Sequence, residues 1–412
     1  MKQAKKLTAR ACIIALLIAI CSLLIVSCGD SSSGDNTSPP AHTTHTWGAW
    51  VEKAATWNED GERTRSCSGC TSTEKEQTYA TGNPELDIEP YGDGSEYRVN
   101  GQTAPLSSTH LYIPMYYQGD ITKPVTAITV DGFAGNGITE AVICANVEII
   151  GDGTFGDCDE LTTVTFKDES KLETIGDYAF VGCFNLKSIT IPKGVTVIGD
   201  YAFANCADVD EGEIEEEGDG ELTGTGLEEV IFEAGSKLKS LGEDAFAECY
   251  FLAAINLQAA ASLEIISNNA FFGCWNLQTI TIPASVTKIG DGAFNMCSDL
   301  KGITIPKSVT FIGYEAFNFC FGLDYIIFEE GSALKTIGDG AFCGTPIPEI
   351  RFPASLKDGQ VGSAVFWNWS NEQTVYVPFA SQTEADAAWG TGWRGNRSDL
   401  GGYVNVKYLP WD

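Results

Sequence analysis

A 23-residue apolar pattern recurs along this chain and constrains its fold more than any other feature. From Leu277 the pattern reads Leu-x-x-Ile-Thr-Ile-Pro-x-x-Val-Thr-x-Ile-Gly-x-x-Ala-Phe-x-x-Cys; it restarts at Leu300, and Leu186 begins an earlier copy. A period of this length is typical of a solenoid, because each repeat makes one coil that cannot bury its apolar face alone. The pattern predicts an extended scaffold with a long exposed surface rather than a closed catalytic pocket.

One phenylalanine per repeat marks the coils, at successive intervals of 22, 25, 23, 43, 25, 23, 23 and 25 residues. The nine positions are Phe133, Phe155, Phe180, Phe203, Phe246, Phe271, Phe294, Phe317 and Phe342. The interval of 43 residues contains an insertion at about 207–226 that is rich in Asp and Glu. Such a charge run predicts a solvated loop. The alternatives are a loose Ca²⁺ site or a docking loop for a basic partner, although EF-hand spacing is absent.

Alternating residues within each repeat indicate short strands. In Ile280-Thr281-Ile282 both isoleucines point to one side and the threonine to the other, which predicts a half-buried strand that Pro283 ends. Val286 and Ile289 begin a second inward segment, and Gly290 permits a turn. We therefore expect a mainly β repeat solenoid in which neighbouring coils stack.

The repeat resembles the BspA-like class of bacterial leucine-rich repeat proteins, over residues 121–366. The resemblance implies a curved solenoid of 23–25-residue coils on a secreted or cell-surface protein. Members of this class are associated with adhesion to host matrix proteins or to other bacteria. A solenoid needs capped ends, and we expect an N-terminal cap at 85–120 and a C-terminal cap at 367–412, the latter with a strand followed by a short helix.

The amino terminus has the features of an export signal. Four basic residues precede an apolar segment at 11–26, which is short for a membrane span. The following Ile25-Val26-Ser27-Cys28 resembles a bacterial lipobox. We expect a lipoprotein signal peptide at 1–27, lipidation at Cys28 and a flexible tether at 28–41; the alternative is an ordinary signal peptide cleaved nearby. Gly29, in place of Asp, favours an outer-membrane or cell-surface destination.

Composition excludes several functional classes. The formal net charge of −31 disfavours nucleic acid and anionic membrane surfaces as partners. The lipid anchor is then the expected membrane contact. The chain has three histidines and lacks His-Glu-x-x-His, Gly-x-Ser-x-Gly and Gly-Lys-Ser/Thr motifs. We expect no enzymatic activity.

Residues 42–80 form a separate small module. His45-Thr-Trp47 and Cys67-Ser-Gly-Cys70 resemble a short His-Trp/Cys-x-x-Cys module found beside repeats in other bacterial surface proteins. That module usually has a cysteine where this chain has Trp57, which argues against a site with four protein ligands. Cys67, Cys70 and His45 (or His42) are candidate Zn²⁺ ligands. The alternative is a local disulfide. No other cofactor is expected.

Seven cysteines, each three residues after a coil phenylalanine, predict a ladder along the solenoid. They are Cys158, Cys183, Cys206, Cys249, Cys274, Cys297 and Cys320. Stacked coils would place neighbouring sulfurs close enough to form disulfides, and an exported protein meets oxidising conditions. However, seven cysteines cannot pair completely, and a buried thiol is a good small apolar filler. We expect buried thiols. Cys144 and Cys343 lie outside this register.

Large aromatic side chains flank the ladder cysteines and are candidates for a ligand-binding surface. They are Phe184, Tyr250, Phe251, Trp275, Phe319 and Phe321. The alternative is that they only pack along the solenoid edge. The function we expect is protein–protein interaction by a lipid-anchored surface protein, through adhesion to host extracellular matrix proteins or bacterial surface proteins. Alternatives are a glycan-binding surface module and a periplasmic structural scaffold.

Overall fold

The computed structural model describes residues 45–209, 223–394 and 404–409. These residues form two compact units, which are described separately. The smaller unit contains residues 45–49 and 66–73, and the larger contains residues 50–65 and the described residues from 74 onward. The predicted signal peptide, the tether and the central part of the acidic insertion (210–222) lie outside the described residues.

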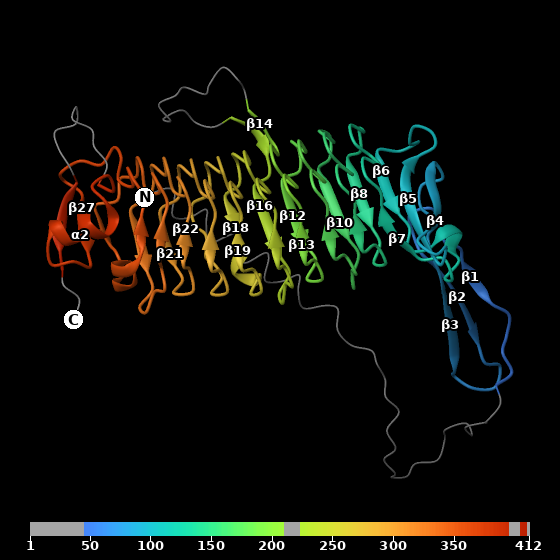
Figure 1. Ribbon diagram of the computed structural model, residues 1–412. Coiled ribbons are helices and arrows are strands. Elements are labelled where there is room, and N and C mark those ends of the chain that lie inside the picture. The colour runs from blue at the N-terminus through green and yellow to red at the C-terminus, as the bar shows by residue number, and fades with distance from the viewer. Residues whose placement is uncertain (1–44, 210–222, 395–403, 410–412) are drawn as a thin grey trace, which may run out of the picture. The chain divides into compact units, whose positions relative to one another are not determined.

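The larger unit is a stack of coils joined by short parallel strands (Figure 1). Each coil begins with an opening strand, except the coil that begins at Leu277. The opening strands are β6 (His110–Ile113), β8 (Glu140–Ile143), β10 (Thr163–Phe166), β12 (Ser188–Ile191), β16 (Glu229–Phe232), β18 (Ala254–Ile255), β21 (Gly302–Ile305), β23 (Tyr325–Phe328), β25 (Glu349–Arg351), β27 (Thr374–Val377) and β28 (Asn405–Tyr408). They form four sheets, β10-β8-β6, β12-β16-β18, β21-β23 and β25-β27-β28.

A second ladder is made by the strands that precede the Ile-Gly turn of each coil. These Ile-Gly strands are β7 (Val125–Ile128), β9 (Ile149–Ile150), β11 (Thr174–Ile175), β13 (Val197–Ile198), β17 (Ser240–Leu241), β19 (Ile265–Ile266), β20 (Lys288–Ile289), β22 (Phe311–Ile312), β24 (Thr336–Ile337) and β26 (Gln360–Val361). They form two sheets that separate between β17 and β19. The predicted mainly β repeat solenoid is therefore confirmed.

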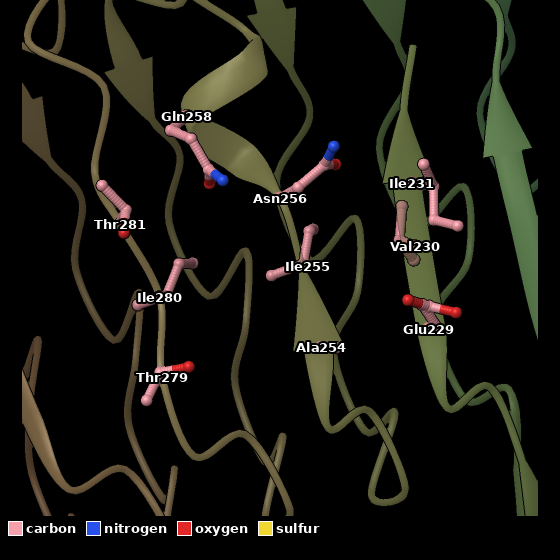
Figure 2. A pocket seen from close by; sticks show the side chains of 10 residues that line it. All are labelled: Glu229, Val230, Ile231, Ala254, Ile255, Asn256, Gln258, Thr279, Ile280 and Thr281. Atoms are coloured by element: carbon pink, nitrogen blue, oxygen red, sulfur yellow. The ribbon is translucent and has the colours of Figure 1, made fainter. Parts of the chain in front are cut away.

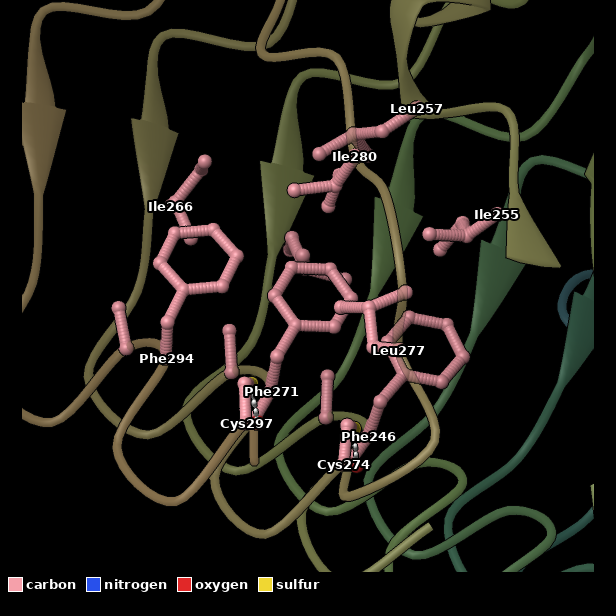
Figure 3. Close-up of a cluster of buried hydrophobic side chains, with 14 of the residues drawn as sticks. Phe246, Ile255, Leu257, Ile266, Phe271, Cys274, Leu277, Ile280, Phe294 and Cys297 are labelled. Carbon is pink, nitrogen blue, oxygen red and sulfur yellow. Dashed lines mark hydrogen bonds between the residues drawn. The ribbon is translucent and has the colours of Figure 1, made fainter. Parts of the chain in front are cut away.

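The nine phenylalanines of the repeat form one continuous column in the core. Successive ring centroids are 5.1–5.9 Å apart and the rings are nearly parallel. All nine side chains are fully buried. Figure 3 shows Phe246, Phe271 and Phe294 in file beside Cys274 and Cys297. Burying a ring of this size contributes about 1.5–3 kcal/mol, and each ring is buried mainly by its neighbours in the stack.

The seven ladder cysteines are buried thiols, as expected. No disulfide joins them, and all seven lie in the part of the chain that the structure describes. Each thiol donates to the carbonyl oxygen of the coil phenylalanine one coil earlier; for Cys297 and Phe271 the distance is 3.2 Å. Burial raises the pKa of the Cys320 thiol to about 12, so it stays neutral and unreactive. The cysteines therefore tie coils together as hydrogen-bond donors.

The Ile-Gly turn is the closest approach between coils. In eight coils the glycine N–H donates to the preceding coil at 2.8–2.9 Å, as Gly313 does to the Ile289 carbonyl oxygen. A Cβ atom at Gly313 would lie 2.4 Å from Asp291 Oδ1 and 2.5 Å from the Asp291 nitrogen. The Asp291 carboxylate in turn accepts from the Tyr314 N–H at 2.8 Å. Glycine is needed here because no side chain fits between the two coils.

Two coils lack this glycine. Thr129 takes its place in the first coil, where the Thr129 N–H still donates to the Val99 carbonyl oxygen at 2.9 Å and β7 pairs with β5; Ser267 takes its place in the other, and the sheet ends there. Ser267 occupies the glycine position of its coil, and its hydroxyl donates to the Leu241 carbonyl oxygen at 2.5 Å. In the coil before it, a Cβ at Gly242 would lie 2.3 Å from the backbone of Gly199. A serine Cβ cannot be accommodated at such a spacing, which accounts for the separation of the Ile-Gly sheet between β17 and β19.

One predicted strand is wrong. Residues 280–282 form no strand, and only an isolated parallel bridge joins Thr279 to Gly302. The expected burial does hold, because Ile280 and Ile282 are buried and Thr281 is exposed. The preceding opening strand, β18, stops after two residues, and η2 (Leu257–Ala259) follows it. The segment therefore lacks a full-length neighbour on that side to pair with.

The two ends of the solenoid differ in construction. At the N-terminal end, β4 (Leu86–Tyr91) and β5 (Glu96–Gln102) form an antiparallel hairpin, and β5 pairs with β7. At the C-terminal end, β27 is followed by α2 (Gln382–Trp389), which is the expected order of strand and helix. The Ser381 hydroxyl caps α2 by accepting from the Glu384 N–H. Trp389 then packs against Phe379, with centroids 4.8 Å apart, over the last coil.

Two smaller features complete the larger unit. A hairpin of β14 (Ala207–Val209) and β15 (Gly224–Gly226) leaves the solenoid where the acidic insertion begins and ends. The strands β1 (Val51–Lys53), β2 (Gly61–Ser66) and β3 (Thr73–Thr78) form an antiparallel sheet whose ion pairs join Arg63 to Glu76 and Arg65 to Glu74. Trp57, which stands where the related module usually has a cysteine, packs into a small cluster with Ala80, Tyr112 and Cys144.

The glycine contact predicts a position-specific effect on stability. Gly313→Ala forces a Cβ into the backbone of the preceding coil and should lower the free energy of unfolding by about 1–3 kcal/mol. Gly137→Ala is the matched control, because a Cβ there meets no atom within 4 Å; it should change stability by less than about 0.5 kcal/mol. Chemical denaturation followed by circular dichroism measures both. Equal effects of the two substitutions would contradict the close-approach argument.

Asp291, which follows the turn glycine Gly290, also contributes to the stability of the solenoid in a way that can be tested. Asp291→Ala removes the acceptor of the Tyr314 N–H and should cost about 0.5–1.5 kcal/mol. Asp291→Asn should be nearly neutral, because Asn268 already accepts from the Asp291 N–H at 3.0 Å in the coil before. Thermal unfolding of the two variants distinguishes a hydrogen-bond role from a charge role. If Asn were as destabilising as Ala, the negative charge would be the property required.

Candidate binding surfaces and a candidate metal centre

The outward positions of the opening strands form a long exposed face. Near the N-terminal end this face carries small hydroxyl side chains, such as Thr163, Thr165 and Thr190, all exposed. Further along, larger apolar side chains appear: Tyr325 is 49% exposed and Ile327 is 52% exposed. Exposed Ile and Tyr on a regular strand face mark a surface able to bury apolar area against another molecule.

A pocket of about 360 Å³ opens in this face between β18 and the unpaired segment at 279–281 (Figure 2). Glu229, Ile231, Gln258 and Thr281 are among the residues that line it. Asn256 gives the pocket its local structure, because its side-chain amide accepts from the Phe232 N–H at 2.7 Å and donates to the Phe232 carbonyl oxygen at 2.9 Å. The Asn256 side chain thus makes the two hydrogen bonds to Phe232 that the backbone of a paired strand would otherwise make.

A second pocket, of about 530 Å³, lies at the break between β10 and β12. Its lining is charged, with Lys167, Asp168 and Glu169 from one coil and Lys193 from the next. The Lys193 N–H donates to Glu233 Oε2 at 2.9 Å, which links the wall of the pocket to the coil beyond. The mixture of signs suits polar contacts with a peptide or protein surface.

The predicted aromatic residues lie along the turns next to the ladder cysteines. Tyr250 and Trp275 are in contact, with ring centroids 4.3 Å apart, and Phe319 lies 5.6 Å from Phe321. Phe321 is 59% exposed. We call these four residues the aromatic edge.

The other two predicted residues have different surroundings. Phe184 is half-buried on its own turn. Phe251 packs against the β14–β15 hairpin, since a Cβ at Gly226 would lie 2.7 Å from its ring. The structure therefore separates these two from the aromatic edge.

Phe319 has an unfavourable backbone conformation. Its φ is +55°, in the left-handed region that bulky residues avoid. The equivalent position has a similar positive φ in the other coils, and it is filled both by glycine, as at Gly273 and Gly344, and by larger residues, as at Asn205, Glu248 and Met296. A phenylalanine here carries a conformational penalty of about 1–2 kcal/mol that glycine avoids.

The sequence analysis missed a second aromatic pair. Tyr178 and Tyr201 stack in parallel on neighbouring coils, with centroids 4.9 Å apart, and are 47% and 37% exposed. The carboxylate of Asp244 raises the pKa of Tyr201, so the hydroxyl stays protonated and remains a hydrogen-bond donor. The sequence did contain a signal for this pair, because both coils carry the same segment, Gly-Asp-Tyr-Ala-Phe.

The smaller unit brings His45, Cys67 and Cys70 together. One ligand atom from each lies within 4.8 Å of the others, and His45 Nδ1 is 3.4 Å from Cys70 Sγ. Cys67 is buried, Cys70 is half-buried and His45 is exposed.

Hydrogen-bond donors surround both sulfur atoms. The Gly69 N–H donates to Cys67 Sγ and lowers the pKa of that thiol. The side chain and backbone N–H of Ser72 lower the pKa of Cys70. Both cysteines are thus biased toward the thiolate form, which is the form that binds metals.

The predicted lipidation site, Cys28, lies outside the described residues. Within residues 45–209, 223–394 and 404–409, the structure contains no helix with the length and hydropathy needed to cross a bilayer.

Comparison with solved structures finds bacterial repeat proteins. A leucine-rich repeat protein from Bacteroides ovatus is 24% identical, with 71% of this chain and 63% of that chain covered and a TM-score of 0.48. A leucine-rich cell surface protein from Faecalibacterium prausnitzii is 20% identical, with 80% and 94% covered and a TM-score of 0.43. The chain thus spans less than two thirds of the length of the first of these proteins.

Comparison with curated proteins gives no match. The family model of the BspA-type leucine-rich repeat region, in contrast, matches six copies of the repeat, over residues 126–253 and 239–373. These matches cover more than half of the chain and include the phenylalanine column, the ladder cysteines and the Ile-Gly turns. The chain belongs to the BspA-type leucine-rich repeat family.

Proposed function

We propose that this protein is a lipid-anchored surface protein that binds other proteins through its solenoid, in adhesion to host matrix proteins or to neighbouring cells. The observation that carries the proposal is the aromatic edge formed by Tyr250, Trp275, Phe319 and Phe321. Contacting pairs of large aromatic rings, one of them largely exposed, are the side chains that most often dominate protein–protein binding energy.

Phe319 connects the aromatic edge to the next coil. Glycine would avoid the backbone penalty at this position, although Glu248 and Met296 also fill it in other coils. The ring does pack on the next coil, because a Cβ at Gly344 would lie 2.7 Å from Phe319 Cδ1. This contact orients the ring along the edge beside Phe321.

The repeat architecture supports binding rather than catalysis. Leucine-rich repeat proteins are typically non-enzymatic binding scaffolds, and the pockets described above lie in an extended face between coils. The titratable groups with the largest pKa changes include the buried ladder cysteines, whose pKa values burial raises. These thiols are inaccessible to a substrate.

The negative charge of the chain selects among protein partners. With a formal charge of −31, the solenoid is repelled by acidic surfaces and attracted to basic ones. Basic patches on matrix proteins are therefore the expected contact region, and the aromatic edge supplies the apolar part of the interface. Attachment should weaken as ionic strength rises, because salt screens the charge attraction.

The aromatic edge predicts a loss of adhesion without a loss of fold. Joint substitution of Tyr250, Trp275 and Phe321 by serine removes three large rings and should reduce binding to immobilised fibronectin, laminin or collagen at least tenfold. Each ring in a well-packed interface contributes about 1–2 kcal/mol or more. Surface plasmon resonance with the purified chain measures the change.

The matched control replaces Ile121 and Val130 by serine, because these apolar side chains are 64% and 59% exposed and lie outside the edge. The control should bind as the wild type does.

Phe319→Gly should keep its stability within about 1 kcal/mol, because the lost ring packing offsets the relieved backbone penalty. The same variant should bind more weakly. Unchanged adhesion in a folded triple variant would remove the edge from the proposal. Binding to soluble oligosaccharides instead would favour the glycan-binding alternative.

The anchor is tested separately. Cys28→Ser removes the predicted lipidation site, and the exported protein should move from the membrane fraction to the soluble fraction. Metabolic labelling with a fatty acid should mark the wild type and not the variant. Protease treatment of intact cells should degrade the wild type. Survival of the protein under that treatment would favour the periplasmic scaffold.

A further inference from the structure

We propose that His45, Cys67 and Cys70 bind one Zn²⁺ ion, with a water molecule as the fourth ligand. The proposal concerns the smaller unit alone and does not depend on what the solenoid binds. It commits to one of the two alternatives for the Cys-x-x-Cys sequence, the metal site, and excludes a local disulfide between the same two cysteines.

The spacing of the ligand atoms fits a tetrahedral ion. With Zn–S of about 2.3 Å and Zn–N of about 2.0–2.1 Å, tetrahedral angles place sulfur and nitrogen about 3.6 Å apart and two sulfurs about 3.8 Å apart. His45 Nδ1 lies 3.4 Å from Cys70 Sγ, and the three ligand atoms lie within 4.8 Å of one another. A relative movement of about 1 Å or less closes the three atoms around an ion.

The backbone holds the ligands in place before any ion arrives. The Cys67 N–H donates to the Ser72 carbonyl oxygen at 2.9 Å and closes the turn that contains Cys70. The Ser68 N–H donates to the Thr46 carbonyl oxygen at 2.9 Å, which brings the segment of His45 alongside that turn. Residues 22 positions apart in sequence are thus fixed next to each other.

Backbone N–H groups donate to both sulfur atoms, and this arrangement favours binding of a cation. The Gly69 N–H donates to Cys67 Sγ and the Ser72 N–H donates to Cys70 Sγ, each at 3.4 Å. Each donor comes from the second residue after its cysteine, so the two halves of the turn repeat one geometry. Such bonds stabilise a thiolate, and a pair of thiolates with an imidazole favours zinc over the oxygen-preferring Ca²⁺ or Mg²⁺.

The exposure of the three protein ligands indicates which molecule supplies the fourth ligand. Cys67 is buried, while Cys70 is half-buried and His45 is exposed. Water therefore reaches the ion from the side of His45. Three protein ligands and one water form the usual coordination of a zinc ion with an open position. Because the smaller unit has few residues with which to form a core, the ion would also stabilise its fold.

The test is metal titration of the full chain, purified in detergent under reducing and metal-free conditions. Co²⁺ serves as the spectroscopic probe. One equivalent should produce the visible absorption of tetrahedral Co²⁺ together with thiolate-to-cobalt charge transfer, and Zn²⁺ should displace both signals. Cys67→Ser with Cys70→Ser should abolish the signals, and His45→Ala should weaken binding at least about 10-fold, the lower limit seen for loss of a single supporting group.

Cys343→Ser is the control for the remaining thiols, because Cys343 is a buried cysteine outside the cluster; it should leave the titration unchanged. Circular dichroism of each variant verifies that the solenoid is folded. The proposal is overturned if no tetrahedral Co²⁺ signal forms, or if the signal persists in the double cysteine variant. It is also overturned if mass spectrometry of the unreduced protein finds a Cys67–Cys70 disulfide. Adhesion measured on the same variants should not change.

Discussion

The distance between coils at the Ile-Gly turn is the constraint on which the rest of the solenoid depends. A glycine at this position lets its N–H reach the carbonyl oxygen of the preceding coil, as Gly313 reaches Ile289 at 2.9 Å. The same spacing brings the core phenylalanines into contact, with centroids 5.1–5.9 Å apart. The cysteine thiols donate further hydrogen bonds between coils, and carboxylates such as that of Asp291 accept hydrogen bonds from the next coil. A larger side chain at this turn can interrupt strand pairing between two coils, as Ser267 does, although those coils remain stacked, with Phe246 and Phe271 5.6 Å apart.

Much of the fold could be predicted because its pattern is periodic, and the errors lie where local chemistry departs from the period. The nine phenylalanines and seven cysteines occupy their expected buried positions. The strand expected at 280–282 is absent because Asn256 bonds to Phe232 through its side chain and β18 ends early. Likewise, Ser267 interrupts the Ile-Gly sheet. Neither effect is visible in apolar spacing, because both depend on a single polar side chain and the atoms it meets in a neighbouring coil.

The candidate sites were predictable in part, for a similar reason. The three metal-ligand candidates follow from residue type, and the structure brings them within 4.8 Å. The aromatic residues follow from their register beside the ladder cysteines, but their surroundings do not. Phe251 packs against a hairpin formed by residues on either side of the insertion, and Tyr178 and Tyr201 pair across coils. Register identifies which residues line up, whereas exposure depends on side chains from other coils.

The close contact between coils lies on the side of the Ile-Gly turns. The opening strands on the other side can therefore vary in length and pairing. The core column runs through all nine coils and the Cys–Phe hydrogen bonds join eight of them, and yet the opening strands divide into four sheets. The three breaks follow the coils that begin at Leu161, Leu252 and Leu323, whereas the equally long coil that begins at Leu227 keeps its pairing, because β16 pairs with β18. Pockets of about 360 and 530 Å³ lie at two of these breaks. Lost strand pairing on this face is tolerated because the opposite side maintains the stack. A repeat protein built in this way can vary its binding face without altering the residues that hold the coils together.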